Sequence, residues 1–240
     1  MTSQVQAVQL VMEPFIAGRD RVLGILPFSH IYGLTLLIHY PLVTGVPIIV
    51  LPRFDEIKVL EVIQKYKITF GYVVPPVLIV LLNSKNVPNY DISSLRGVMS
   101  GAAPLSADLA HAVQDKLKFG VTQGYGLTET SPVSHVMTVE ESKGRKGRIG
   151  KLMPTYQARL VTEDGKDVVS QGKGERGELW LRGPSVMKGY WRNADATKNT
   201  FAEGGWFMTG DVAEVDDEGY FAIVDRVKEL IKYKGFQGES

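Results

Sequence analysis

The chain has 240 residues, of which 44% are hydrophobic and 22% are charged, and its formal net charge is +1. These values are typical of a globular protein with a sizeable core, and the near-zero charge gives no reason to expect nucleic acid or an acidic membrane as a partner. The sequence contains no cysteine, which excludes disulfides, thiolate metal sites and a cysteine nucleophile.

A charge-free run extends from Val22 to Pro52. Its length would permit a membrane span, but Pro41, Gly45 and other prolines and glycines interrupt it. We therefore predict no membrane span, and instead buried strands at 22–28 and 47–52 with a helix at 34–43 between them. Residues 1–18 contain no Lys or Arg and so lack the basic region of a targeting peptide. The expected location is cytoplasmic or peroxisomal.

Strands and helices continue to alternate as far as residue 141. The expected strands are 68–73, 95–104 running into a turn, and 119–126, and the expected helices are 54–67, 77–84 and 105–118. Asp55 lies near the start of the first of these helices, and Ser106 is the expected N-cap of the last. This order predicts an α/β fold with a parallel sheet and flanking helices.

From about residue 142 the pattern changes to short β segments separated by glycine-rich turns. The segments are 156–162, 178–183 and 220–225, which predicts a small antiparallel β unit after the parallel sheet. The basic stretch 143–151 has no interleaved aromatic residue. It therefore reads as a solvated loop rather than a polyanion site.

Two turns follow predicted parallel strands and carry unusual residues, 100-SGAAP-104 and 124-GYGLTE-129. Ligands of such sheets bind beyond the carboxyl ends of the strands. Tyr125 offers a flat face for a base, Thr128 a donor for a phosphate, and Glu129 a ligand for Mg²⁺. The alternative is that these glycines serve only a tight turn. Neither the dinucleotide fingerprint nor a Walker loop is present.

Five ordered motifs together resemble the acyl-adenylate-forming, or AMP-binding, enzymes, with 4-coumarate–CoA ligases, acyl-CoA synthetases and firefly luciferases as the nearest groups. They are 26-LPFSHIYG-33, 100-SGAAPL-105, 124-GYGLTET-130, 205-GWFMTGD-211 and 225-DRVKELIKYKG-235. The resemblance implies part of the large N-terminal domain of these enzymes. It also implies ATP or AMP, Mg²⁺ and coenzyme A as cofactors or co-substrates, with a small carboxylic acid as partner.

The resemblance assigns a nucleotide site to residues of both predicted units. Tyr125 would stack on adenine, with Gly124 and Gly126 beside it. Thr128 would contact the α-phosphate, Glu129 would hold Mg²⁺, and Asp211 and Arg226 would bind the ribose. The opposite wall of the adenine site would be Gly101, Ala102 and Ala103.

The resemblance also implies an acyl pocket and a hinge. His30 would lie at the mouth of the pocket, although a structural histidine is the alternative. The remaining pocket residues would be Tyr32, Leu36, Val74, Pro75, Pro132 and Val133, whose apolar character favours an aromatic or medium-chain acid. Ordinary core packing is the alternative at each position. Lys228 matches the hinge, and Lys232, Gly235 and Gln237 match residues of the thioester-forming step.

The implied division is an α/β subdomain at 1–141, a β-rich subdomain at 142–225, and a hinge with a truncated C-terminal domain at 226–240. The family's phosphate loop and C-terminal lysine have no counterpart in the chain, so we expect a central fragment of an acyl-CoA synthetase that does not turn over alone. Two alternatives stay open: an adenylating enzyme with a different acceptor, as in luciferases or carrier-protein loading, and a non-catalytic nucleotide-binding remnant.

Overall fold

The computed structural model describes residues 2–12, 14–145, 147–168 and 174–227, and the backbone of 230–233 and 236–239. The chain divides into two compact units, Met1–Pro154 and Thr155–Ser240. The first unit extends past residue 141 because a short strand at Lys151–Leu152 joins its sheet. The division into functional subdomains stays a prediction.

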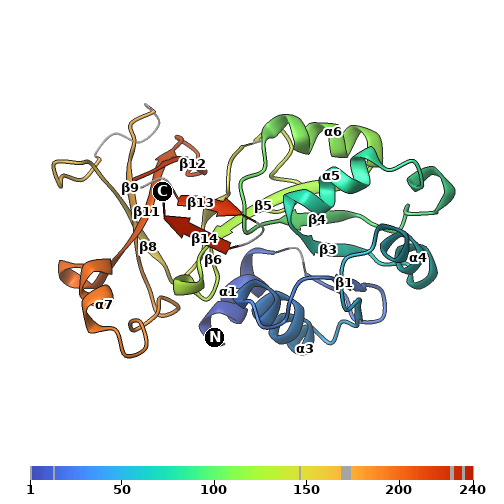
Figure 1. Cartoon of the computed structure of the whole chain (residues 1–240), viewed down its shortest axis with the longest axis horizontal. Helices are drawn as coiled ribbons and strands as arrows, with labels where there is room; N and C mark the ends of the chain where they lie inside the picture. Colours follow the sequence, from blue (N-terminus) through green and yellow to red (C-terminus); the bar gives the residue numbers. More distant parts are fainter. Residues whose placement is uncertain are drawn as a thin grey trace. The chain divides into compact units, whose positions relative to one another are not determined.

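The first unit is built on a seven-stranded sheet with the order β2-β1-β3-β4-β5-β6-β7 (Figure 1). Strands β1 to β5 are parallel to one another, and the pairings of β5 with β6 and of β6 with β7 are antiparallel. This arrangement confirms the predicted largely parallel sheet. The strands are β1 (Val22–Gly24), β2 (Ile48–Val50), β3 (Phe70–Val73), β4 (Gly97–Ser100), β5 (Gly120–Gly126), β6 (Val133–Val136) and β7 (Lys151–Leu152).

Three helices cover one face of this sheet: the amphipathic α4 (Glu56–Tyr66) and α6 (Ala107–Leu117), and the largely apolar α5 (Pro75–Asn83). Asp55 and Ser106 cap α4 and α6 by accepting hydrogen bonds from the backbone N–H of Lys58 and Leu109, at 2.9 and 3.2 Å, so the predicted N-cap is confirmed. Helix α5 begins at its prolines rather than after them, because proline in the first turn lacks only an N–H that no helical carbonyl would accept.

The core between this face and its helices is aliphatic. Leu23, Val98 and Val121 of the strands pack there against Leu60 of α4 and Val113 of α6. The larger set of fully buried contributors includes Val59, Ile63, Ile68, Val73 and Leu78. Burial of such side chains stabilises a fold by about 1.5–3 kcal/mol each. The carboxyl edge of the sheet is therefore held on a rigid base.

The charge-free run forms β1, β2 and the helical segments between them, as predicted. These segments are α2 (Ile31–Gly33), the π-helix η1 (Leu34–His39) and α3 (Tyr40–Thr44). The π-helical turn in place of a regular helix was not predicted. No helix among the described residues combines the length and apolar composition that a membrane span requires.

The face of the sheet opposite the aliphatic core carries aromatic residues. Tyr72 of β3 packs edge-on against Tyr32, and Phe70 packs against Phe15, with ring centroids 6.0 and 5.6 Å apart. Helix α1 (Thr2–Val11), which the sequence did not predict, belongs to this part of the unit. The aromatic layer places Tyr32 directly below the carboxyl edge of the sheet.

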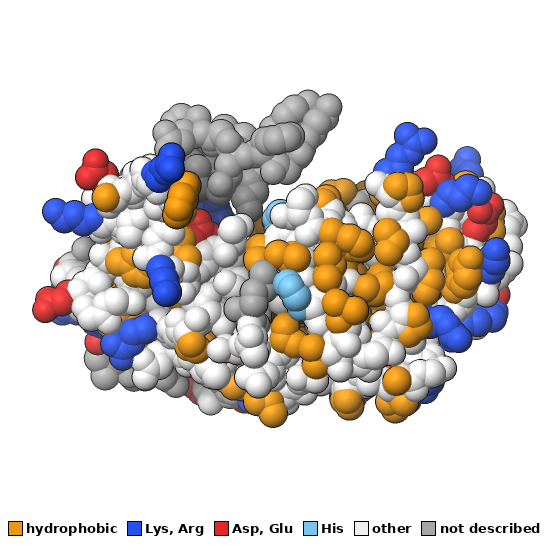
Figure 2. Space-filling view, turned by 90° about the horizontal axis from the view of Figure 1, so that it is seen from below, with side chains coloured by type: hydrophobic (Ala, Val, Ile, Leu, Met, Phe, Trp, Pro, Cys, Tyr) orange, Lys and Arg blue, Asp and Glu red, His pale blue; other side chains and the backbone are white. Residues whose placement is uncertain are grey.

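Apolar side chains are also exposed near the charge-free run. Leu42 is 75% exposed, Val43 59% and Val50, in the edge strand β2, 52%. Figure 2 shows a face of the first unit on which hydrophobic side chains gather. Apolar surface of this kind marks a place where another surface binds or where chains associate.

The second unit is a five-stranded antiparallel sheet with the order β10-β11-β9-β8 and with β12 paired to β11. It confirms the predicted antiparallel β unit, although the longest strand, β11, was not predicted. Its elements are β8 (Gln157–Val161), β9 (Gly177–Arg182), α7 (Ala194–Thr200), β10 (Phe201–Ala202), β11 (Trp206–Val215) and β12 (Phe221–Arg226). Strands β13 (Leu230–Tyr233) and β14 (Phe236–Glu239) form a separate hairpin.

Candidate functional site

The two turns singled out in the sequence lie side by side at the carboxyl edge of the first sheet. Strands β4 and β5 are adjacent and parallel, with Ser100 paired to Gln123 at the end of the register. Gly101–Ala103 leave the sheet after β4, whereas Gly124–Gly126 are the last residues of β5 and pair with β6, so the two segments lie at neighbouring points of this edge. This is the position at which ligands of parallel sheets bind.

Gly101 is buried and cannot gain a side chain without movement of its neighbours. A Cβ at this position would lie 3.2 Å from the ring of Tyr32. Tyr32 is itself fixed, since its hydroxyl donates to the carbonyl of Met99 at 3.0 Å, and burial raises its pKa well above the ordinary value. Ala102 and Ala103 are exposed, and Ala102 has a φ of +65°. The first turn thus presents backbone and methyl groups to the edge of the sheet.

Tyr125 is half-buried and packs against His135, its partner in the antiparallel pairing of β5 and β6. The two ring centroids are 5.8 Å apart with planes tilted by 60°. His135 is fully buried, and burial lowers its pKa to about 3, so the imidazole is neutral at physiological pH. The sequence reasoning missed His135. Residues 133–136 read VSHV and are all buried, so this strand lacks the alternation that marks a half-buried strand in a sequence.

The polar residues after Tyr125 divide into two kinds. The hydroxyl of Thr130 accepts from the N–H of Leu127 at 2.8 Å and donates to the carbonyl of Pro132, so buried Thr130 closes the turn. Thr128 is exposed and Glu129 is half-buried in the 3₁₀ turn η3 (Thr128–Thr130). Thr128 and Glu129 are therefore the two that the fold leaves accessible to a ligand.

Gly126 is needed for the close return of the chain. A Cβ at this position would lie 1.9 Å from the carbonyl oxygen of Pro132, and one at Gly124 would lie 3.3 Å from the flexible Sδ of Met99. The two glycines that flank Tyr125 thus have different roles. Gly126 allows the backbone to pack, whereas the surroundings of Gly124 can adjust to a small side chain.

The described side chains would supply only part of the coordination shell of a magnesium ion. The described residues contain no group of three or more His, Asp or Glu side chains placed to hold a metal. Magnesium bound to nucleotides uses one or two carboxylates and completes its shell with phosphate oxygens and water. Glu129 could supply one such carboxylate, because it is half-buried in the turn η3 that follows β5.

The predicted acyl-pocket residues are only partly brought together. Leu36 and Val133 meet around an apolar cavity too small for a water molecule, shared with Val8, Met12, Met99, Val136 and Met153, as ordinary core packing would place them. Val74 and Pro75 lie instead at the start of α5 and do not line it. Pro132 is buried next to Val133.

His30 is exposed, and its Nδ1 accepts from the N–H of Tyr32 at 3.1 Å, which makes it the N-cap of α2. This bond assigns one ring nitrogen to a structural role, as the structural alternative expected. The other ring nitrogen belongs to an exposed side chain, so the proposed role at the pocket mouth stays a prediction.

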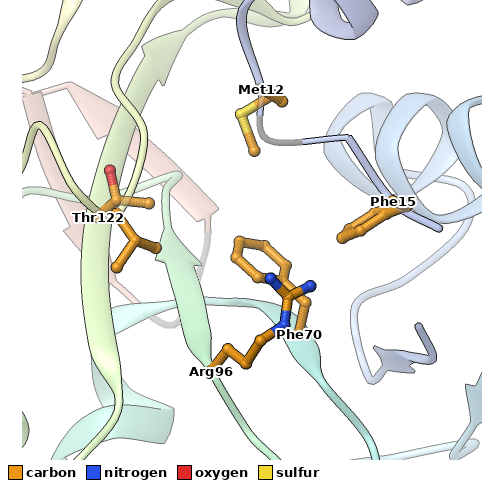
Figure 3. A pocket seen from close by; sticks show the side chains of 6 residues that line it. Met12, Phe15, Phe70, Arg96 and Thr122 are labelled. Atoms are coloured by element: carbon orange, nitrogen blue, oxygen red, sulfur yellow. The ribbon is translucent and has the colours of Figure 1, made fainter. Parts of the chain in front are cut away.

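A second cavity lies away from these turns. It measures about 10 Å³ and is lined by Met12, Phe15, Phe70, Arg96, Thr122 and Val139 (Figure 3). Phe70 begins β3 and Arg96 precedes β4, so the cavity lies toward the amino ends of the strands. This volume has room for about one water molecule and does not suit a nucleotide.

In the second unit, Asp211 and Arg226 are paired. They are register partners in β11 and β12, and the Nε of Arg226 lies 2.7 Å from Oδ1 of Asp211. Asp211 is 1% exposed. The two residues predicted to bind ribose thus form an ion pair between adjacent strands.

The remaining predicted residues lie near the end of the chain. Lys228 and Gly235 lie outside the described residues. Lys232 and Gln237 are backbone partners in the hairpin of β13 and β14. Their roles stay predictions.

The parallel sheet, the two adjoining turns and the antiparallel unit with its Asp211–Arg226 pair define the class of adenylate-forming enzymes. Residues 1–191 match the model of the AMP-binding enzyme family, and the chain belongs to this family. It is 43% identical over 221 residues to the probable 4-coumarate–CoA ligase 1 of Dictyostelium discoideum, an alignment that covers 91% of this chain and 39% of that protein.

Solved structures lead to the same class. ATP-bound MatB from Rhodopseudomonas palustris matches with a TM-score of 0.85 and 30% identity, over 98% of this chain and 45% of that one. The amide bond synthetase McbA from Marinactinospora thermotolerans matches with a TM-score of 0.83 and 27% identity, over 100% of this chain and 47% of that one. The chain spans about two fifths of the length of the curated relatives it matches.

Proposed function

We propose that the chain supplies nucleotide-binding and acyl-binding parts of an ATP-dependent acid–CoA ligase. The observation that carries this proposal is the adjacency of the turn at Gly101–Ala103 and the end of β5 at Gly124–Gly126, with Tyr125 between its two glycines at the carboxyl edge of the sheet. Membership of the AMP-binding enzyme family and similarity to a probable 4-coumarate–CoA ligase support it.

The residues of the first unit would bind the base and the phosphates. Adenine would stack on the ring of Tyr125, which itself packs against His135. The turn of Gly101–Ala103 would form the opposite wall of the adenine site. Thr128 would donate to the α-phosphate, and Glu129 would hold magnesium, which neutralises phosphate charge when bound. In the second unit, Asp211 would accept from the ribose hydroxyls because an ionised carboxylate is an acceptor only. Arg226 would orient Asp211 through their ion pair.

The proposed reaction has two halves. A carboxylate oxygen of the acid attacks the α-phosphorus of ATP, pyrophosphate leaves, and an acyl-adenylate forms. The thiolate sulfur of coenzyme A then attacks the acyl carbonyl, the bond to the AMP oxygen breaks, and the thioester forms. Phosphoryl transfer depends mainly on positioning and charge stabilisation, which is the work that Thr128 and Glu129 would do. Lys232, Gly235 and Gln237 would serve the thioester half.

The acid would carry an aromatic or medium-chain apolar group. The predicted pocket residues Tyr32, Leu36, Val74, Pro75, Pro132 and Val133 are aromatic or aliphatic, which favours an uncharged apolar tail. The gap around Leu36 and Val133 has no room for a water molecule, so side chains there would have to move for an acid to enter.

A different acceptor is the second candidate. Similarity to an amide bond synthetase favours an amine in place of coenzyme A. The experiment loads the 240-residue chain with a non-hydrolysable aromatic acyl-adenylate analogue and measures binding of coenzyme A and of an amine. Binding of coenzyme A supports the ligase. Binding of the amine alone supports the second candidate, and failure of the analogue itself to bind contradicts both.

A further inference from the structure

Strand β11 changes register just before Asp211. Its pairing with β9 runs from Met208 opposite Trp180 to Val212 opposite Glu178, with an irregularity between the two. Gly210 lies in this segment with a φ of +72°, a conformation that glycine adopts without strain. We call residues 209–211 the β11 bulge. Bulges re-aim side chains of the strand that carries them, and Asp211 is the last residue of this one.

Glu178 of β9 holds the bulge through its carboxylate. Oε1 accepts from the backbone N–H of Gly210 at 2.9 Å, and Oε2 accepts from the indole N–H of Trp180 at 2.8 Å. Each oxygen thus has a donor. Because the indole fixes one oxygen, the other is directed at the glycine amide rather than at solvent. The half-buried position of Glu178 strengthens such charge-assisted bonds.

Three further hydrogen bonds hold the backbone of the β11 bulge in place. Thr209 donates through Oγ1 to the carbonyl of Leu179 at 2.7 Å and accepts from the N–H of Asp211 at 3.1 Å. The carbonyl of Gly210 accepts from the N–H of Val227 at 2.9 Å. Both sides of the Gly210 residue are therefore fixed, one by the Glu178 side chain and the other by the chain after Arg226.

These hydrogen bonds determine the direction of the Asp211 side chain. Its side chain points to the buried face of the sheet and meets the guanidinium of Arg226 at 2.7 Å. Without the bond from Gly210 to Glu178, the bulge could relax toward regular pairing with β9, and Asp211 would change its direction. Groups that orient a ligand-binding side chain in this way affect binding without touching the ligand.

We propose that Glu178 is a positioning residue, which sets the Asp211 carboxylate for the ribose hydroxyls of the nucleotide through the amide of Gly210. The inference rests on the proposed function, because it needs Asp211 to bind ribose. It adds a residue that does not itself contact the nucleotide. Trp180 contributes indirectly, because its indole N–H fixes Oε2 of Glu178.

The test measures dissociation constants of AMP and of 2′,3′-dideoxy-AMP with the 240-residue chain. Glu178→Ala is expected to weaken AMP about tenfold, a change that corresponds to about 1.4 kcal/mol, and to change dideoxy-AMP binding less than about twofold. Asp211→Asn is expected to show the same pattern. Glu214→Gln is the matched control, because it changes a carboxylate of β11 that lies outside the bulge. It should leave both dissociation constants unchanged.

A second pair of variants guards against loss of folding. Glu178→Gln has one acceptor oxygen for two donors and should weaken AMP binding. Adding Trp180→Phe removes the indole donor, so the glutamine oxygen can face Gly210, and binding should recover. Equal weakening of both ligands, or no recovery in the double variant, would overturn the positioning role alone. A wild-type chain that binds both ligands equally, with Asp211→Asn unchanged, would overturn the ribose assignment as well.

Discussion

Arg226 and Asp211 form an ion pair of 2.7 Å across β12 and β11, and the carboxylate side chain is 2% exposed whereas the guanidinium side chain is 29% exposed. A buried carboxylate depends on such a partner, because the charge loses its hydration on folding. The pair therefore has two consequences, one for the stability of the second unit and one for the direction of a side chain that we propose to bind ribose.

Arg226→Met is expected to destabilise the chain by about 1–3 kcal/mol, less than the ~3–5 kcal/mol of a fully buried pair because the arginine is partly exposed. Asp211→Asn should cost less, since it leaves no buried charge without its partner. Urea unfolding of both single variants and the double variant gives the coupling energy. A coupling below about 0.5 kcal/mol would show that the two residues act independently.

Asp20 should make the first unit sensitive to strong acid. Its carboxylate is buried, and although burial raises the pKa, hydrogen bonds from Arg19 and the Ile16 amide and the charge of Arg96 lower it more, from 3.8 to about 2. A carboxylate with a lowered pKa stabilises the fold above its unfolded pKa. This contribution, about 2 kcal/mol, should be lost as the pH falls from about 4 to 2.

Asp20→Asn should lack this component of acid sensitivity. The difference in unfolding free energy between wild type and variant should shrink across that pH range. Asp115→Asn, an exposed carboxylate on α6, is the control. A difference that stays constant down to pH 2 would contradict the assigned network.

His135 should make the free energy of unfolding depend on pH at higher pH values than Asp20 does. Burial lowers its pKa from 6.5 to about 3, so it stays neutral in the folded chain and takes up a proton on unfolding. Below pH 6.5 the unfolded state binds more protons, and stability should fall by about 1.4 kcal/mol per pH unit. His135→Gln should remove this slope between pH 6 and 4. An unchanged slope in the variant, measured by urea unfolding at several pH values, would assign the effect to other groups.

Gly124 and Gly126 should respond differently to the same substitution. Gly126→Ala places a methyl group 1.9 Å from the Pro132 carbonyl oxygen and is expected to cost about 3 kcal/mol or more, because backbone must move. Gly124→Ala meets the flexible Sδ of Met99 at 3.3 Å and should cost about 1 kcal/mol or less. Thermal unfolding of the two variants in parallel compares them. Equal losses would mean that the turn is not held by the close approach to Pro132.

Much of the first unit could be predicted from its sequence because local signals agree with tertiary structure. The Ser106 cap and the amphipathic pattern fixed α6, and the alternation of strands with helices fixed the parallel sheet. The neighbouring positions of the turns at Gly101 and Tyr125 then follow from strand order alone. The start of α5 was predicted at residue 77 rather than at Pro75, although proline is favourable in the first turn of a helix.

Features that depend on non-local pairing could not be predicted in this way. Strand β11 escaped notice because Gly210 interrupts its alternation, and the register shift that directs Asp211 toward Arg226 exists only once β9 and β12 are in place. Likewise, Thr128 and Thr130 are alike in sequence, and only the return of the chain to Pro132 separates an exposed hydroxyl from one that closes the turn.

The central claim is that a purine base lies on Tyr125, and titration calorimetry of AMP with the 240-residue chain tests it most directly. Tyr125→Ala should raise the dissociation constant roughly 5- to 150-fold, since stacking of a base on an aromatic ring is worth about 1–3 kcal/mol. Tyr125→Phe, which keeps the ring, should bind AMP nearly as the wild type does. Equal affinity of wild type and Tyr125→Ala, or no uptake of AMP by the wild-type chain, would contradict the account.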